Sequence, residues 1–296
     1  MWIPITLAAA VFQILRTARQ HELRSVLSPS AAGFARYAYG CPMALTASVV
    51  VFGALGRDLP TPNPRFWASI GVAAVAQILA TVALLRSFRA RDFAIGTVYS
   101  KSEVLFVAAL GLLGVDELLS VSGWVGTLLV TTGVVWLAAD GSVATSIGRF
   151  SDPAALLGLG AGSGFAVAAV GIGEASRSLL DAPPFDRALF TLTVLLIVQT
   201  LLNAGWFLAV EPAEIARTAL AWRPAVSVGL FSLLGSLGWA WGFTLESAAK
   251  VRTLGQVELV IAFAVAHRTL AERHTRREHL ASALVLVGVV LVAVKG

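Results

Sequence analysis

Two acidic residues and a lysine stand inside stretches that are otherwise apolar enough to cross a membrane. Lys101 and Glu103 lie in the segment Thr97–Glu117, and Glu258 lies in a similar segment near the end of the chain. An ionised side chain at the centre of a bilayer costs about 2.5–3.5 kcal/mol, so it persists where it pairs, faces water or has a function. A desolvated glutamate has a raised pKa and can exchange a proton near neutral pH. Both glutamates are therefore candidates for solute or proton transfer, the alternative being that they fix helix ends through hydrogen bonds.

The two segments are related by an internal repeat. Three identical pairs fall at the same separation of 155 residues: Glu103 and Glu258, Glu117 and Glu272, Gly133 and Gly288. The same alignment places Gln256 opposite Lys101. Each copy would hold five helices, an odd number, so the second copy enters the membrane from the opposite side. The repeat therefore predicts two inverted units with a pathway along the seam between them.

The composition predicts a protein that crosses the membrane several times. The chain has 296 residues, of which 57% are hydrophobic and 13% are charged, and its mean hydropathy is +0.81. Soluble domains carry about 25% charged residues. The net charge of +5 is spread between apolar runs, with no basic block of the kind that binds nucleic acid. Cys41 is the single cysteine, which excludes an intramolecular disulfide and a CxxC metal site.

A transmembrane helix needs about 20 mostly apolar residues. By that criterion we predict about ten spans: 2–20, 31–55, 66–87, 93–114, 121–139, 153–175, 187–210, 224–245, 250–271 and 278–295. We expect a first repeat over 1–139, a polar linker over 140–152 and a second repeat over 153–296. The first segment has no charged start and no small-residue cleavage site, so we expect a retained span rather than a signal peptide. A short helix with an interfacial tail is the alternative for this segment.

Polar residues on the first two spans are further candidates for the pathway. On a helical wheel Gln13, Arg16, Thr17 and Gln20 gather within about 100°, which predicts a polar stripe facing a bundle or a wet cavity. Arg36 lies less than two turns inside the second span. Its guanidinium could snorkel to the surface or pair with an intramembrane carboxylate or a solute anion.

The motifs of membrane-embedded and soluble enzymes are missing from the sequence. The four histidines form no HExxH, and there is no DDxxD, no GxSxG and no phosphate-cradling glycine loop. We therefore expect a protein that is not an enzyme and that uses no metal and no cofactor.

The end of each half resembles the drug/metabolite transporter superfamily, in its EamA-like branch. The matching motifs are Tyr99-Ser-Lys-Ser-Glu103, Asp116-Glu117 and Gly133-Val-Val, then Leu254-Gly-Gln-Val-Glu258, Ala271-Glu272 and Gly288-Val-Val; near the start they are Gln13-Ile-Leu-Arg16 with Gln20, and Phe34-Ala-Arg36-Tyr with Gly40-Cys-Pro42. The resemblance implies secondary transport of small metabolites, often export of amino acids or related compounds, with both termini in the cytoplasm. The distribution of arginines opposes that orientation, because the connections that would then lie outside carry more of them.

These observations predict an all-α membrane protein, EamA-like in its two inverted five-helix repeats. We expect a multi-pass transporter of the cell (inner) membrane that moves a small organic solute by alternating access, with proton coupling as an option. The candidate pathway residues are Gln13, Arg16, Arg36, Tyr99, Lys101, Glu103, Gln256 and Glu258. The expected partners are that solute and the lipid bilayer, with no nucleic acid, and a monomer or a homodimer. The alternative is a non-transporting scaffold or lipid-handling partner with a sealed core.

Overall fold

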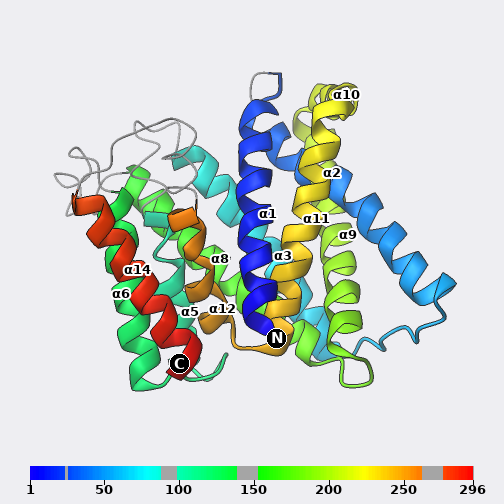
Figure 1. Ribbon diagram of the computed structural model, residues 1–296. Helices are drawn as coiled ribbons and strands as arrows, with labels where there is room; N and C mark the ends of the chain where they lie inside the picture. The colour runs from blue at the N-terminus through cyan, green and yellow to red at the C-terminus, as the bar shows by residue number, and fades with distance from the viewer. Residues whose placement is uncertain (24–25, 88–98, 139–152, 262–275, 296) are drawn as a thin grey trace. The chain divides into compact units, whose positions relative to one another are not determined.

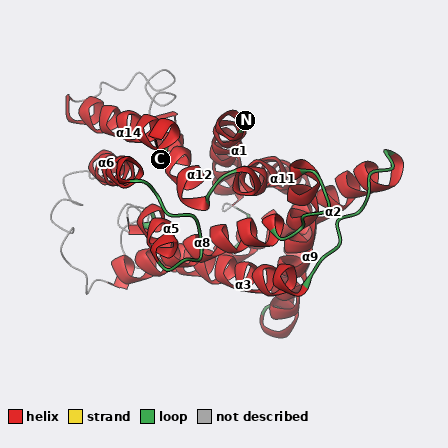
Figure 2. Cartoon of the chain, turned by 90° about the horizontal axis from the view of Figure 1, so that it is seen from below, coloured by secondary structure: helices red, strands yellow, loops and turns green. Residues whose placement is uncertain are grey.

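The computed structural model describes residues 1–23, 26–87, 99–138, 153–261 and 276–295 (Figure 1). The helices of this part of the chain are α1 (Trp2–Leu23), α2 (Pro29–Ser48), α3 (Pro64–Ser87), α5 (Glu103–Leu112), α6 (Val121–Ala138), α8 (Pro153–Arg177), α9 (Pro184–Val210), α10 (Pro212–Leu220), α11 (Trp222–Leu245), α12 (Ala248–Gly255) and α14 (Arg276–Lys295). A π-helical segment, Val49–Ala54, continues α2. Figure 2 shows helices and loops only, so within these ranges the prediction of an all-helical chain is confirmed.

Prolines and small residues set the boundaries of these helices. Five of them, α2, α3, α8, α9 and α10, begin at a proline, which suits the first turn because its missing N–H would be unbonded there anyway. The Ser28 hydroxyl accepts a hydrogen bond from the Ala31 N–H at 3.1 Å and so caps α2. Gly56 and Gly114, just after helical segments, have φ of 64° and 72°, a conformation that favours glycine.

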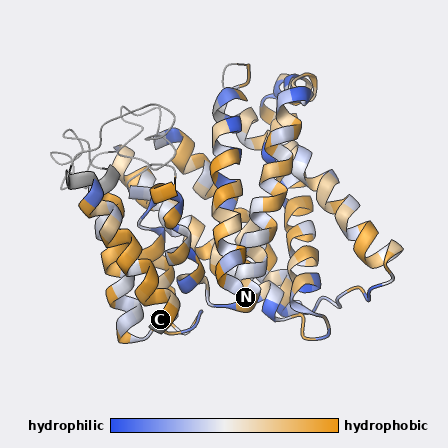
Figure 3. Cartoon of the chain, in the orientation of Figure 1, coloured by the Kyte–Doolittle hydropathy of each residue, from blue (hydrophilic) through white to orange (hydrophobic). Residues whose placement is uncertain are grey.

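Five helical segments in the described ranges are long and apolar enough to cross a membrane. They are Ser30–Ala54, Pro64–Ser87, Pro153–Arg177, Pro184–Val210 and Trp222–Leu245. In Figure 3 the shorter α14 is also hydrophobic along most of its length, with hydrophilic residues at its start. The architecture is that of an all-α membrane protein.

The chain forms two compact units, and each draws on both halves of the sequence. Unit 1 contains Met1–Val75 and Gly171–Leu245, and unit 2 contains Ala76–Val170 and Glu246–Gly296. These units are defined by contacts in space, whereas the predicted repeats 1–139 and 153–296 are defined by sequence. The division into repeats stays a prediction. The predicted linker 140–152 lies outside the described residues.

In unit 1 the helices α1 and α11 pack closely because small residues face each other. A Cβ added at Gly238 would lie 2.8 Å from the Cβ of Ala9 and 3.3 Å from the carbonyl oxygen of Ile5. One turn earlier on α11, Gly235 faces Phe12 and Gln13 at 3.5 Å. Residue numbers rise along α1 while they fall along α11, so the two helices are antiparallel. Such close approach maximises van der Waals contact where lipid removes the hydrophobic driving force.

In unit 2 the helices α6 and α14 lie side by side in both ribbon views (Figures 1 and 2). A Cβ at Gly126 would lie 2.7 Å from the carbonyl oxygen of Gly288, and one at Gly133 would lie 2.8 Å from that of Ala281. Ala281 and Gly288 follow Gly126 and Gly133 by the repeat separation of 155 residues. The two contacts therefore exchange when the repeats are exchanged, as in an antiparallel pair with local twofold symmetry.

Two of the predicted spans differ from the structure. The spans 93–114 and 250–271 were expected to be continuous helices, whereas turns interrupt them at Lys101–Ser102 and at Gln256. Residues 93–98 and 262–271 of these spans lie outside the described part of the chain. The hydrophobic pattern predicts only that such a segment is buried, and a single turn inside it leaves that pattern unchanged.

Candidate functional site

The two helix interruptions stand at equivalent positions of the repeat. Residues 99 and 100 are helical, Lys101 and Ser102 form a turn, and α5 begins at Glu103. In the second half α12 ends at Gly255, Gln256 forms a turn, and the chain is helical again from Val257. Lys101 and Gln256 are separated by the same 155 residues as the repeated glutamates. Both interruptions belong to unit 2, so their side chains can be compared directly.

A local hydrogen bond supports the first turn. The Ser102 N–H donates to the Tyr99 carbonyl at 3.2 Å, and the Ser102 hydroxyl donates to the same oxygen at 2.6 Å. A serine that binds a nearby carbonyl offers the backbone an alternative to the helical ladder. The phenol ring of Tyr99 packs against a small apolar cluster of Ala154 and Ala155 at the start of α8.

Four ionised side chains meet at these interruptions in two ion pairs. The Lys101 ammonium pairs with the Glu258 carboxylate, and the Arg252 Nε lies 2.7 Å from the Glu103 Oε1. The exposed fractions of these side chains are only 17%, 10%, 12% and 10%, in the order Lys101, Glu258, Arg252, Glu103. Each pair joins a residue of the first repeat to one of the second. Two acids and two bases make the cluster neutral, which offsets the large cost of burying each charge alone.

The two pairs are similar under the repeat without being identical. If the two repeats were exchanged exactly, the pair of Lys101 and Glu258 would correspond to a pair of Gln256 and Glu103. The cation that Glu103 receives comes instead from Arg252, one helical turn before Gln256. Gln256 is 4% exposed, and its Nε2 donates to the Arg252 carbonyl at 3.4 Å. The two carboxylates therefore occupy equivalent positions of the repeat, whereas the two cations differ in position by one helical turn.

Neighbouring elements of unit 2 hold the interrupted helices in place. Gly162 of α8 faces the first turn so closely that an added Cβ would lie 2.7 Å from the Ser102 hydroxyl and 2.9 Å from the Ser100 carbonyl oxygen. The Asp116 carboxylate accepts the Ala249 N–H at 3.3 Å at the start of α12. An anion at this position also interacts favourably with the positive end of the helix dipole.

Three of the predicted pathway residues belong to unit 1. The side-chain oxygen of Gln13 on α1 accepts a hydrogen bond from the Trp239 indole N–H of α11 at 3.0 Å. The Arg36 guanidinium lies 5.2 Å from the centre of the Tyr37 ring, a cation–π distance. Arg16 is partly buried on the same helix as Gln13. The structure thus brings Lys101, Glu103, Gln256 and Glu258 to one region of unit 2, with Tyr99 beside its first turn, while these three lie in unit 1.

Sequence reasoning missed Arg252, the cation that pairs with Glu103. It lies near the start of the predicted span 250–271 and was not among the candidate pathway residues. The spacing of Arg252 to Gln256, four residues on a helix, was the signal that could have placed it beside the second interruption. The hydrogen bond between Trp239 and Gln13 could not be predicted from spacing, because 226 residues separate the two positions.

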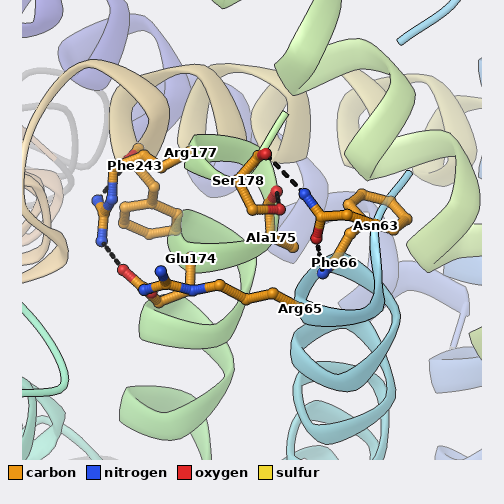
Figure 4. A network of polar contacts seen from close by, with 8 residues as sticks. All are labelled: Asn63, Arg65, Phe66, Glu174, Ala175, Arg177, Ser178 and Phe243. Carbon is orange, nitrogen blue, oxygen red and sulfur yellow. Dashed lines mark hydrogen bonds and ion pairs between the residues drawn. The ribbon is translucent and has the colours of Figure 1, made fainter. Parts of the chain in front are cut away.

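A second charged network lies in unit 1, where the ends of three helices meet (Figure 4). Glu174 near the end of α8 pairs with Arg65 of α3 and, at 2.9 Å, with Arg177. Arg177 also donates to the Phe243 carbonyl at 2.8 Å, in the last turn of α11. A cation there satisfies a carbonyl that the helix leaves unbonded and faces the negative end of its dipole.

The loops beside this network are joined in the same way. The Asn63 side chain accepts the Phe66 N–H at 2.9 Å and donates to the Ser178 carbonyl at 2.8 Å (Figure 4). The Asp181 carboxylate accepts the Thr61 N–H at 2.9 Å. This hydrogen bond from the Thr61 backbone holds the pKa of Asp181 below its usual value. The network and these loops together tie α3, α8 and α11 at one end of unit 1.

Comparison with known proteins supports the fold and no particular activity. No family model matches the chain, and no curated protein matches it. A solved structure described as "Crystal structure of protein" has a TM-score of 0.73 and 15% sequence identity, with 98% of this chain and 96% of that chain covered. At this identity the similarity shows a shared fold, which extends over nearly the whole chain. The fold and the apolar helices define an all-α protein with membrane-spanning helices.

Proposed function

We propose that the protein is a secondary transporter of a small organic solute, and that the region of Lys101, Glu103, Gln256 and Glu258 is part of its pathway. The observation that carries this proposal is the pair of helix interruptions at equivalent repeat positions, each beside buried ionised groups. Interrupted helices in a membrane expose backbone groups and are tolerated where they line a site. Many transporters built from inverted repeats bind solutes and coupling ions at such interruptions near the membrane midplane.

The resemblance to EamA-like transporters adds the finer parts of the proposal. These are ten spans in two inverted repeats, alternating access, a location in the inner membrane, and export of an amino acid or related compound. The contacts of α6 with α14, which exchange under the repeat, support the inverted arrangement. The two ion pairs supply groups that a charged solute or a proton can compete for, because each pair can open when another charge replaces one partner.

One observation favours a second candidate function, a membrane scaffold with a sealed core. All four ionised side chains at the interruptions have partners within the protein. A scaffold needs these pairs only for folding, so it predicts no solute-dependent change at the site. A transporter needs the same pairs in one of its states and must be able to open them. The two candidates therefore differ in whether any solute competes with the pairs.

Transport by the reconstituted protein tests the proposal. Purified protein is first screened by thermal unfolding against amino acids, organic acids, sugars and nucleosides, since a ligand stabilises the state that it binds. Labelled compounds that raise the midpoint are then followed in a counterflow assay with vesicles. We expect uptake above empty vesicles, and its loss in Glu103→Gln and Glu258→Gln.

The matched control is Glu22→Gln, which opens an exposed ion pair between Glu22 and Arg19 on α1. This variant should transport as the wild type does. Folded wild-type protein that moves none of the compounds, or a Glu258→Gln variant with undiminished uptake, would leave the scaffold as the better account.

A further inference from the structure

Gln256 is a buried polar residue at the second interruption that takes part in neither ion pair. It replaces the lysine of the first repeat and occupies the turn that ends α12. Its Nε2 donates a hydrogen bond to the Arg252 carbonyl at 3.4 Å, so the side-chain oxygen is the remaining polar atom of the amide. Among the residues that the structure describes, this Oε1 is buried and accepts no hydrogen bond. The whole residue is 4% exposed, so bulk water does not reach it.

A buried hydrogen-bond acceptor without a donor lowers the stability of the folded protein. The presence of such an acceptor at Gln256 therefore calls for an explanation. Leaving a neutral group unpaired in the interior costs the protein its desolvation free energy. The two cations of the cluster pair with carboxylates rather than with this oxygen, Lys101 with Glu258 and Arg252 with Glu103. An apolar side chain of the same length would avoid this cost and would lose only the 3.4 Å hydrogen bond from Nε2 to the Arg252 carbonyl.

We propose that the Gln256 side-chain oxygen is a specificity determinant that accepts a hydrogen bond from an N–H or O–H group of the transported solute. The inference rests on the proposed function and adds the chemical class of the solute. A site built to accept a hydrogen bond strongly rejects an analogue without the donor, because the acceptor is then buried unpaired. The protein therefore discriminates between a solute with a free amine or hydroxyl and its methylated form.

The residues around Gln256 suit such a solute. The carboxylates of Glu103 and Glu258 lie at the same interruptions and can accept further hydrogen bonds or a positive charge. Lys101 and Arg252 supply donors for an acceptor or an anionic group on the solute. Gln256 adds a neutral acceptor, and no cation in the described part of the chain donates a hydrogen bond to it.

Gln256→Met tests the assignment, because methionine keeps the length of the side chain and removes the unpaired acceptor, together with only a long hydrogen bond of 3.4 Å to the Arg252 carbonyl. We expect its thermal unfolding midpoint without solute to equal or exceed that of the wild type. The control is Gln20→Met on α1, where the glutamine Nε2 donates to the Ala32 carbonyl at 2.9 Å. Since that change removes a satisfied hydrogen bond, its midpoint should fall. A Gln256→Met midpoint that falls as far would show a structural role for the amide and overturn the proposal.

Solute discrimination gives the second measurement. The probes are two pairs in which methylation removes the donor, namely glycine with N,N,N-trimethylglycine and lactate with 2-methoxypropionate. The wild type should bind the donor-bearing member of a pair about tenfold more tightly or better, and Gln256→Met should reduce that ratio towards one. Wild-type protein that prefers neither member of either pair, or a variant that keeps the wild-type ratio, would overturn the proposal.

Failure of the proposed function has a different signature. Wild-type protein that binds a donor-bearing probe but does not carry it into vesicles would end the assignment as a transporter. The role of Gln256 in binding would then still stand, on the loss of discrimination in Gln256→Met.

Discussion

At the scale of single residues, the buried charges at the interruptions are balanced by one another. Each glutamate is only 10% exposed, so burying its carboxylate without a cation beside it would cost a large desolvation free energy. Such pairs add little net stability compared with apolar residues, yet opening one by removing a single partner is costly. This asymmetry suits a site that must hold its charges at rest and release them to a competing group.

The pair of Lys101 and Glu258 gives a prediction for stability. Lys101→Met removes this cation from the buried Glu258 and should destabilise the protein by about 3–5 kcal/mol, whereas Lys101→Met with Glu258→Leu should recover most of that loss. Thermal unfolding of the single and double variants measures the coupling. The exposed pair of Arg19 and Glu22 is the control, and its coupling should not exceed about 1 kcal/mol. Additive effects of the two changes at Lys101 and Glu258 would contradict the pairing.

At the scale of elements, α8 holds the first interruption because it carries a glycine at the contact. Gly162 lets the backbone of α8 approach the turn before α5, where an added Cβ would lie 3.0 Å or less from two backbone atoms. Backbone atoms cannot move aside as the end of a flexible side chain can. The shape of the turn at Lys101 and Ser102 therefore depends on a residue about sixty positions away.

Gly162→Ala should destabilise the protein by about 1–3 kcal/mol, because the methyl group forces α8 away from the turn. Gly160 on the same helix has nothing within 4 Å of an added Cβ. Gly160→Ala should therefore stabilise the protein by about 0.5–1 kcal/mol through its helix propensity alone. The thermal unfolding midpoints of the two variants should shift in opposite directions. Equal shifts would show that the two glycines have similar surroundings.

The loops at one end of unit 1 give a prediction for pH. The Asp181 carboxylate holds the Thr61 N–H, and its pKa is lowered in the folded protein by that hydrogen bond. A lowered pKa means that the contact is fully present above the unfolded value of about 3.9 and is lost as the pH falls through the folded value. Hydrogen exchange of the Thr61 amide, corrected for the intrinsic rate, should therefore accelerate on acidification. Asp181→Asn should weaken the protection already at neutral pH, and a pH-independent protection would contradict the contact.

At the scale of the whole molecule, the antiparallel packing of α6 and α14 fixes which connections share a side of the membrane. α6 begins beside the end of α14, as the contacts of Gly126 with Gly288 and of Gly133 with Ala281 require. Exposed residues near those ends, Ser120 and Val294, should therefore react from the same side. Ser120→Cys and Val294→Cys, made in a Cys41→Ala background, can be labelled with an impermeant maleimide in oriented vesicles. Labelling from opposite sides would exclude the antiparallel pair.

A reporter protein fused to the C-terminus shows on which side of the membrane the C-terminus lies. The resemblance to EamA-like transporters implies that both termini lie in the cytoplasm, although the arginines of the connections favour the opposite. A green fluorescent protein reporter should then be fluorescent, and an alkaline phosphatase reporter should be inactive. The reverse pattern would show that the arginine distribution decides the orientation and that the resemblance misleads on this point.

The sequence by itself determined that the chain is helical, how its helices begin and which of its acids are unusual. Mean hydropathy and runs of about 20 apolar residues are local properties, and so are prolines at helix starts such as Pro29 and Pro184. The repeat of 155 residues singled out Glu103 and Glu258 because it compares positions without needing their contacts.

Only the tertiary structure decided which cation meets which acid. Arg252 pairs with Glu103 because α12 and α5 are packed within one compact unit, although 149 residues separate the two positions. The interruptions at Lys101 and Gln256 also escaped prediction, since one turn leaves the apolar pattern intact. Periodicity carries information over a few residues along the chain, whereas ion pairs and unpaired buried groups arise from segments that meet only after folding.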